Sequence, residues 1–341
     1  MFNTVYRLAA PRRFETAFQN INLNEGRVLV KPEYLSICHA DQRYYQGLRN
    51  PEVLRKKLPM ALIHEGIGTV VHDPTGEFEK GQRVVMIPNQ PMEQDTVIGE
   101  NYLRSSRFCS SGYDGFMRDY VDLKPDRLVK LSDKVSNEVG AFIELVSVSY
   151  HALMRMEQFS HERRRRIGIW GDGNLGFITS LIVKTLFPQR EVVILGVNQE
   201  KLASFTFADE TYLTDEMPDD FWVDHGIECV GGIYASKAIN QMIDVIQPEG
   251  TISLLGVSEV KVDINTRMVL EKGLRLYGSS RSGRKDFEGV VAMLEQHPVV
   301  TQYLETLIAR VMDINQMSDI AKAFELDQQK NMGKTVMKWN L

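Results

Sequence analysis

The chain has 341 residues, of which 43% are hydrophobic and 25% charged, with a formal net charge of −5. This length favours two domains over one small core, and the acidic balance argues against non-specific nucleic-acid binding. The sequence does not open with a secretory signal, and its longest apolar stretch (177–187) contains Lys184 and is too short to span a bilayer. The three cysteines are far apart and form no disulfide framework. We therefore expect a cytoplasmic protein with no membrane or nucleic-acid partner.

The first 145 residues alternate short β-like runs with turns. The runs 27–38, 66–73, 81–88 and 116–123 are rich in aliphatic and β-branched residues, and Gly, Pro and Asp separate them. This pattern predicts a β-rich barrel or sandwich.

One buried-looking segment in this half, PMALIHEGIGTVV (59–71), contains His64 and Glu65 side by side. Cys38 lies 26 residues before His64, and Glu144 lies where the second half begins. Thiolate, imidazole and carboxylate are the ligand types of catalytic zinc. Taken singly, each residue has a structural explanation: a hydrogen-bonded pair for His64 and Glu65, a buried thiol for Cys38, and a helix-start carboxylate for Glu144.

From about residue 146, predicted strands alternate with helices. The strands are 165–170, 191–197, 225–231, 251–257 and 274–280, and the helices are 173–187, 199–207 and 234–246. This alternation predicts parallel βαβ units in a doubly wound α/β sheet. The last sixty residues return to helix, and 333–341 is a plausible strand that could rejoin the first domain. We expect residues 1–145 and 281–341 to form one domain, and 146–280 the other.

The first strand of this second half ends in GDGNLG (171–176), which also opens a helix. In that context, Gly171, Gly173 and Gly176 match the dinucleotide-binding pattern, with Asn174 and Leu175 at the helix N-terminus that faces the phosphates. Three spaced glycines alone could serve strand–helix packing. Because this pattern follows Glu144, it also favours a zinc site over the separate structural explanations of the four candidate ligands.

The end of the next strand bears on the choice of coenzyme. Enzymes that prefer NAD usually place an acid there to hold the ribose hydroxyls. Here Asn198 follows the strand, no carboxylate comes before Glu200, and Lys201 follows. The absent acid and the nearby cation favour NADPH, although Lys201 could equally be a solvated helix residue.

Together these motifs resemble the zinc-dependent medium-chain dehydrogenase/reductase family, in particular its polyol dehydrogenase branch, over essentially the whole chain. The resemblance rests on residues 38–41, 64–66, 112–121, Glu144 and 171–176. It implies a GroES-like β-rich catalytic domain and a Rossmann coenzyme domain. The stretches CHADQRYYQG, IHEGIGTVV, SSGYDGFMRDYV and GSSRSGRKDF are similar to the ribulose-5-phosphate reductases of CDP-ribitol synthesis.

This closer resemblance implies NADPH-dependent reduction of D-ribulose 5-phosphate to D-ribitol 5-phosphate, for wall teichoic acid or capsule. It also implies a homodimer and ribitol-5-phosphate cytidylyltransferase as a candidate partner. Two alternatives stay open: an NAD-dependent polyol dehydrogenase acting on an unphosphorylated sugar alcohol, and a non-catalytic NADPH-binding protein.

The resemblance further implies one catalytic zinc held by Cys38, His64 and Glu65, with Glu144 as fourth ligand or as holder of the zinc water. Ala40 stands where many relatives have a relay hydroxyl, so Glu65, Glu144 or a water would deliver the proton. Between 88 and 110 only Cys109 is present, and we therefore expect no structural zinc.

The resemblance also implies where the coenzyme lies: along the glycine loop, Asn198, Lys201, Val257 and Ser280. A sugar phosphate needs cations, because it is best met by charge-assisted hydrogen bonds, often from Arg. We prefer Arg43, five residues after Cys38, together with Arg281; Arg49, Arg104 and Arg107 are further candidates, and each could instead form a surface salt bridge. Tyr44 could line the substrate pocket or pack between strands.

Overall fold

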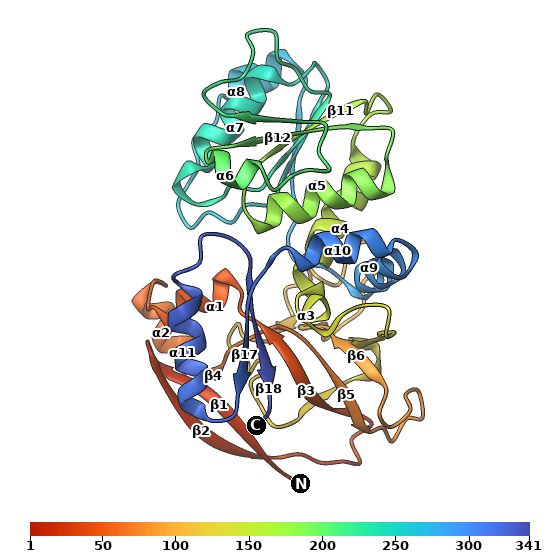
Figure 1. The fold of residues 1–341 in the computed structure, drawn as a ribbon, viewed down its shortest axis with the longest axis vertical. Coiled ribbons are helices and arrows are strands. Elements are labelled where there is room, and N and C mark those ends of the chain that lie inside the picture. The colour runs from red at the N-terminus through yellow and green to blue at the C-terminus, as the bar shows by residue number, and fades with distance from the viewer. The chain divides into compact units, whose positions relative to one another are not determined.

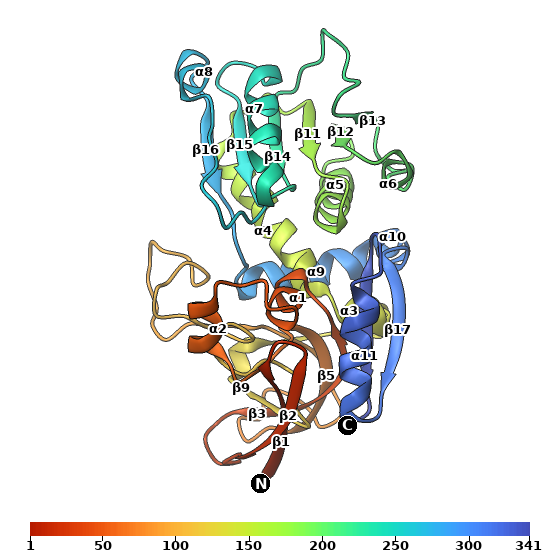
Figure 2. The ribbon, with the colours of Figure 1, turned by 90° about the vertical axis from the view of Figure 1, so that its left-hand side faces the viewer.

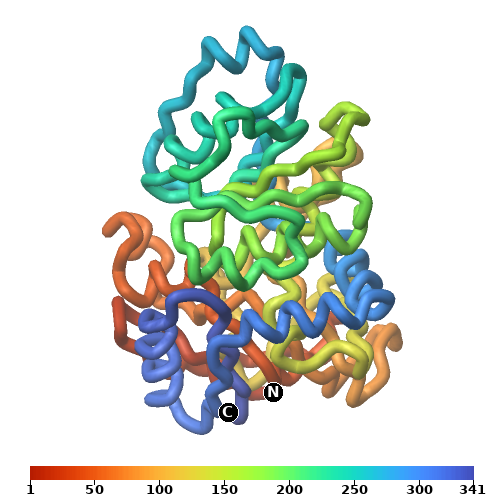
Figure 3. The backbone as a smooth tube through the Cα atoms, turned by 45° about the horizontal axis from the view of Figure 1, so that its top comes forward, coloured from red at the N-terminus to blue at the C-terminus, as the bar shows by residue number.

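The computed structural model describes all 341 residues, and they form two compact units. The first unit comprises Met1–Ser147 and Ser282–Leu341, and the second comprises Val148–Arg281. Both ends of the chain belong to the first unit, as the tube in Figure 3 shows. None of the helices combines the length and apolar character needed to cross a bilayer.

The first unit is built on a seven-stranded sheet in the order β10-β6-β5-β3-β18-β17, with β9 also pairing with β3. Figure 1 labels β6, β5, β3, β18 and β17 of this sheet. A hairpin of β1 and β2 pairs with β4, and β7 pairs with β8. The strands are β1 (Phe2–Ala10), β2 (Arg13–Asn20), β3 (Val28–Ser36), β4 (Met60–Ala61), β5 (Glu65–His72), β6 (Arg83–Met86), β7 (Asn89–Gln90), β8 (Arg107–Phe108), β9 (Val121–Leu123), β10 (Leu128–Lys130), β17 (Ile308–Ile314) and β18 (Lys334–Trp339). The helices are α1 (His39–Tyr45), α2 (Pro51–Lys57), the 3-10 turn η1 (Pro125–Arg127), α3 (Asn137–Gly140), α9 (Arg284–Gln296), α10 (Pro298–Glu305) and α11 (Met317–Asp327).

The β-rich first domain expected from the sequence is confirmed, with differences in detail. The run 116–123 forms a strand only over β9, and the β1–β2 hairpin was not expected. The final run does rejoin this unit, because β18 pairs antiparallel with β3 and parallel with β17.

Close packing of β5 on β3 fixes the position of the residues that precede and open β5. A Cβ at Gly68 would stand 2.2 Å from the carbonyl oxygen of Lys31, and one at Gly66 would stand 2.5 Å from Leu35 Cδ2. Glycine, which has no Cβ, allows this close approach. The pairing shifts register at Leu29/Val30 and again at Pro32/Tyr34, and its last pair places Ser36 opposite Glu65.

The second unit contains six parallel strands, confirming the doubly wound sheet. Figure 2 shows them side by side in the order β13-β12-β11-β14-β15-β16, the Rossmann order. The strands are β11 (Arg166–Trp170), β12 (Glu191–Gly196), β13 (Glu210–Leu213), β14 (His225–Glu228), β15 (Thr251–Leu254) and β16 (Arg275–Gly278). The helices are α4 (Ile143–Phe159), which enters from the first unit, α5 (Asn174–Leu186), α6 (Gln199–Leu202), the 3-10 turn η2 (Gly232–Tyr234), α7 (Ala235–Val245) and α8 (Thr266–Glu271). The helix expected over 199–207 ends early, at Leu202.

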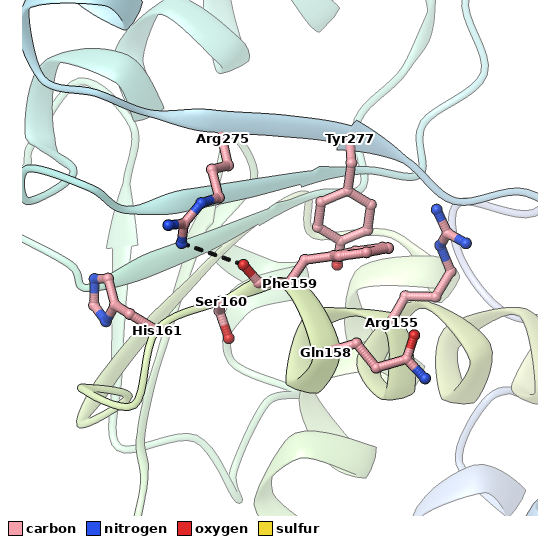
Figure 4. A pocket seen from close by; sticks show the side chains of 7 residues that line it. All are labelled: Arg155, Gln158, Phe159, Ser160, His161, Arg275 and Tyr277. Atoms are coloured by element: carbon pink, nitrogen blue, oxygen red, sulfur yellow. Dashed lines mark hydrogen bonds between the residues drawn. The ribbon is translucent and has the colours of Figure 1, made fainter.

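A cavity of about 610 Å³ lies between the C-terminal turn of α4 and β16 (Figure 4). Arg275 donates a hydrogen bond to the Phe159 carbonyl at 3.3 Å, and the guanidinium of Arg155 lies over the rings of Phe159 and Tyr277. Because Arg275 begins β16, the cavity lies at the amino edge of the sheet. Open α/β sheets bind ligands at the carboxyl edge, so this cavity is not the coenzyme site.

His225, at the start of β14, is buried and held in one tautomer. Its Nδ1 accepts a hydrogen bond from the Thr251 backbone N–H at 3.1 Å, and its Nε2–H donates to the Arg163 carbonyl at 3.0 Å. Burial, assisted by the neighbouring His161, lowers the pKa of His225 to about 4. The fold therefore requires the neutral imidazole.

We expect the second unit to lose stability on mild acidification. The pKa of His225 is lower in the folded chain than its unfolded value of about 6.5, so the unfolded state binds more protons between these values. The stabilisation is fully present above about pH 6.5 and is lost, by up to about 3 kcal/mol, as the pH falls toward 4. Urea unfolding at about pH 7 and about pH 5 should show a larger acid-induced loss for wild type than for His225→Gln. Equal losses in the two proteins would contradict this assignment.

Candidate active site

Three of the sequence-predicted zinc ligands come together at the start of β5. Cys38 caps α1 two residues after β3 ends, His64 immediately precedes β5, and Glu65 is its first residue. Because Ser36 lies opposite Glu65, Cys38, two residues after Ser36, comes close to His64, the residue before Glu65. The ligand atoms of the three residues all lie within 4.8 Å of one another.

The chemistry of this cluster fits a zinc ion. His64 and Glu65 are 7% and 0% exposed, so their polar atoms have little access to water. His64 Nδ1 makes no hydrogen bond, and the nearest carboxylate oxygen, Asp41 Oδ1, lies 3.6 Å away. A thiol, an imidazole and a carboxylate gathered in a shielded site match the donor set of catalytic zinc, which leaves one position for water or substrate.

Asp41 fixes the geometry around two of these ligands, a role that the sequence did not reveal. Its Oδ2 accepts from the Cys38 N–H at 3.2 Å, and its Oδ1 accepts from the Ile63 N–H at 3.1 Å and Ser110 Oγ at 2.5 Å. Burial alone would raise the pKa of Asp41, but His64 and these hydrogen bonds lower it. An ionised carboxylate beside a ligand imidazole orients the ring and raises its basicity. The spacing from Cys38 to Asp41, that of a helix capping box, was the only signal of this role.

Glu144, the fourth residue expected at the zinc, lies in the first turn of α4 and is buried. It stands outside the 4.8 Å group formed by the other three. Burial raises the pKa of the Glu144 carboxyl to about 7; His64 opposes this shift and Glu65 adds to it. A carboxyl with a raised pKa can hold and donate a proton, which fits an acid or base role. Its place as fourth zinc ligand or as holder of the zinc water stays a prediction.

The glycine loop has the backbone geometry that a pyrophosphate requires. Gly171 has a φ of 129°, and a Cβ at Gly176 would stand 1.9 Å from the Gly171 carbonyl oxygen. Gly173 caps α5, which begins with Asn174 and Leu175. The loop therefore turns tightly onto the N-terminus of α5.

The other predicted coenzyme residues lie at the same carboxyl edge of the parallel sheet. Asn198 follows β12, Val257 follows β15 and Ser280 follows β16, and Val257 and Ser280 are exposed. The Asn198 side chain accepts from the Lys201 backbone N–H at 3.0 Å and so caps α6.

The expectation of an uncharged end to β12 is wrong in one respect. Oδ2 of Asp172, the second residue of the glycine loop, accepts hydrogen bonds from the backbone N–H groups of Val197 at 2.7 Å and Asn198 at 2.8 Å. A carboxylate is thus present at this strand end, supplied by the loop rather than by the strand.

Comparison with known proteins agrees with this geometry. Residues 24–133 match the model of the alcohol dehydrogenase GroES-like domain, and residues 137–338 match that of the glucose dehydrogenase C-terminus. Proteins named ribulose-5-phosphate reductase from Bacillus spizizenii and ribulose-5-phosphate reductase 2 from Staphylococcus aureus are 51% and 50% identical over the full length of both chains. The chain belongs to the medium-chain dehydrogenase/reductase family. The crystal structure of S. aureus TarJ in complex with NADPH matches this dehydrogenase with a TM-score of 0.90 and 45% identity over all of both chains.

Glu65 of this dehydrogenase has a buried partner that sequence reasoning missed. Lys334, the first residue of β18, places Nζ 2.8 Å from Glu65 Oε2 and also donates to the Ile37 carbonyl at 3.0 Å. Burial alone would lower the pKa of Lys334, but the Glu65 carboxylate raises it. Lys334 Nζ also donates to Glu65 Oε1 at 3.0 Å, so the ammonium faces both oxygens of the predicted carboxylate ligand and balances its charge.

Two of the predicted substrate residues of the dehydrogenase lie on α1, which begins directly after Cys38. Arg43 is partly buried, and Tyr44 is buried with its hydroxyl accepting from Lys57 Nζ at 3.1 Å. The Arg49 guanidinium lies 4.9 Å from the centroid of the Tyr44 ring. The third, Arg281, is the last residue of the second unit and has a left-handed backbone with φ of 58°. Their roles in substrate binding stay predictions.

The solitary Cys109 is buried and accepts a hydrogen bond from Gln90 Nε2 at 3.3 Å. It is not among the three residues gathered as possible metal ligands.

Proposed function

We propose that this dehydrogenase reduces D-ribulose 5-phosphate to D-ribitol 5-phosphate, with NADPH as the reductant and one zinc at Cys38, His64 and Glu65. The observation that carries the proposal is this ligand cluster, with His64 and Glu65 buried, in a chain that is about half identical, end to end, to proteins named ribulose-5-phosphate reductase. NADPH is supported by its presence in the structure of TarJ. When bound, zinc supplies a Lewis acid for the C2 carbonyl oxygen, and NADPH supplies a hydride.

The chain's own residues would divide the remaining work. Asp41 lies 3.6 Å from His64 Nδ1 and would orient the imidazole electrostatically, and Lys334 balances the charge of Glu65. With its pKa near 7, Glu144 would hold the proton that the product oxygen needs, which replaces the relay hydroxyl missing at Ala40.

Coenzyme and substrate would be held by separate groups. The loop from Gly171 to Gly176 would bind the pyrophosphate, Asn198 and Lys201 the adenosine ribose, and Val257 and Ser280 the nicotinamide half. Arg43 and Arg281 would bind the sugar phosphate, and the cations of Lys57 and Arg49 around Tyr44 add positive charge on the α1 side.

We also propose that the protein works in the cytoplasm as a homodimer. All three of its cysteines are free, as a reducing compartment requires. Its product would pass to ribitol-5-phosphate cytidylyltransferase for the CDP-ribitol of wall teichoic acid or capsule.

Substrate comparison tests the proposal directly. With NADPH, we expect kcat/KM for D-ribulose 5-phosphate to exceed that for D-ribulose by about 100-fold, because charge-assisted hydrogen bonds hold the phosphate. Loss of NADPH absorbance measures both rates, and chelation should abolish turnover until zinc is restored. Arg43→Met should reduce the preference for the phosphorylated sugar, whereas Arg55→Met, on the exposed surface of α2, should not. Equal turnover of both sugars, or turnover that survives chelation, would refute the proposal.

A further inference from the structure

The carboxylate of Asp172 lies at the end of β12 and is tied to that strand end by two hydrogen bonds. Its Oδ2 accepts hydrogen bonds from the backbone N–H groups of Val197 and Asn198. A Cβ on Gly196 would stand 2.7 Å from the Asp172 Cβ, so the side chain packs directly on the last residue of the strand. Asp172 is half-buried, and no hydrogen bond of its Oδ1 is present in the structure.

In a Rossmann sheet of this order, the end of the second strand is where the 2′ position of the adenosine ribose is recognised. An acid at this place accepts a hydrogen bond from a 2′-hydroxyl. The same charge opposes a 2′-phosphate, which is dianionic or nearly so near neutral pH. Here β12 is the second strand, and its own end carries no acid before Glu200. Asp172 supplies the acid from the glycine loop instead.

We propose that Asp172 determines the coenzyme selectivity of this dehydrogenase. Its Oδ1 accepts from the 2′-hydroxyl of NADH, and its charge weakens binding of the 2′-phosphate of NADPH. The protein therefore binds both coenzymes, and its preference for NADPH, carried by Lys201, is smaller than it would be without Asp172. This inference rests on the coenzyme role given to the second unit in the proposed function.

A purely structural role for Asp172 predicts a different result. If the carboxylate only ties the glycine loop to the strand end, its loss should weaken NADH and NADPH binding to the same extent. The side-chain oxygen of Asn can also accept hydrogen bonds from both backbone N–H groups. Asp172→Asn therefore removes the charge but keeps the hydrogen bonds between the glycine loop and the strand end.

Titration calorimetry of the zinc-loaded protein with NADPH and with NADH separates these roles without turnover. We expect Asp172→Asn to bind NADPH more tightly and NADH more weakly than the wild type does. The ratio of the NADH dissociation constant to the NADPH dissociation constant should rise by about tenfold. Lys201→Met should shift the ratio in the opposite direction. The matched control is Asp244→Asn, which removes an exposed carboxylate near the C-terminal end of α7, in the same unit.

An unchanged ratio in Asp172→Asn, or an equal loss of affinity for both coenzymes, would overturn the inference. Urea unfolding would show whether the variant folds; if it does not, Asp172→Ser repeats the test, because the hydroxyl oxygen can still accept from a backbone N–H. A wild-type protein that binds neither coenzyme would instead refute the proposed function.

Discussion

Replacing Cys38 with serine should remove the zinc and lower kcat/KM for D-ribulose 5-phosphate by about 1000-fold or more, since a Lewis acid contributes several kcal/mol to transition-state stabilisation. The thiolate is one of three protein donors within 4.8 Å of one another, and a serine hydroxyl is a poor zinc ligand. Metal analysis of the purified protein and the loss of NADPH absorbance measure the two effects.

The matched control is Cys109→Ser. Cys109 is buried, whereas Cys38 is partly exposed; the Cys109 thiol accepts a hydrogen bond from Gln90 and lies outside the ligand cluster. We expect this variant to retain its zinc and its turnover. A fully active, zinc-loaded Cys38→Ser protein would refute the site, and a loss of zinc from Cys109→Ser would contradict the expectation of a single catalytic metal.

Replacing Lys334 with methionine should destabilise the zinc-free protein by about 3–5 kcal/mol, because it leaves Glu65 as an uncompensated buried charge. Lys334 is 2% exposed and Glu65 is fully buried, so water cannot replace the lost ammonium. Urea unfolding after zinc removal measures this change in the free energy of unfolding.

A second substitution identifies the cause. In Lys334→Met combined with Glu65→Gln, the buried charge is gone, and we expect much of the lost stability to return. Additive destabilisation by the two changes would show that the loss comes from packing of the lysine stem rather than from the ion pair. Bound zinc should also reduce the cost of Lys334→Met, because a divalent cation can balance Glu65 in place of the ammonium.

The sequence predicted those parts of the structure whose signals are local. The glycine loop with its strand and helix lies within about twenty residues, and the alternation of strands and helices predicts the sheet that the structure confirms. Cys38, His64 and Glu65 were recognised by residue type, and the β3–β5 register explains why they meet.

Other features depend on contacts that no local pattern contains. Lys334 reaches Glu65 across 269 residues, through the pairing of β18 with β3, and a lone lysine opening a strand carries no sign of this. Asp172 was missed for a different reason. The usual pattern places the selective acid at the end of the second strand, and here a side chain from the preceding loop occupies that position.

The position of β18 between β3 and β17 also bears on how the chain matures during synthesis. The second unit is one continuous stretch, Val148–Arg281, so it can reach its final fold on the ribosome before β17 and β18 emerge. Until then β3 lacks its neighbouring strand β18, and the carboxylate of Glu65 lacks the ammonium of Lys334 that balances its charge. The coenzyme half of the molecule can thus mature ahead of the metal centre, even though Cys38, His64 and Glu65 are among the earliest residues to be translated.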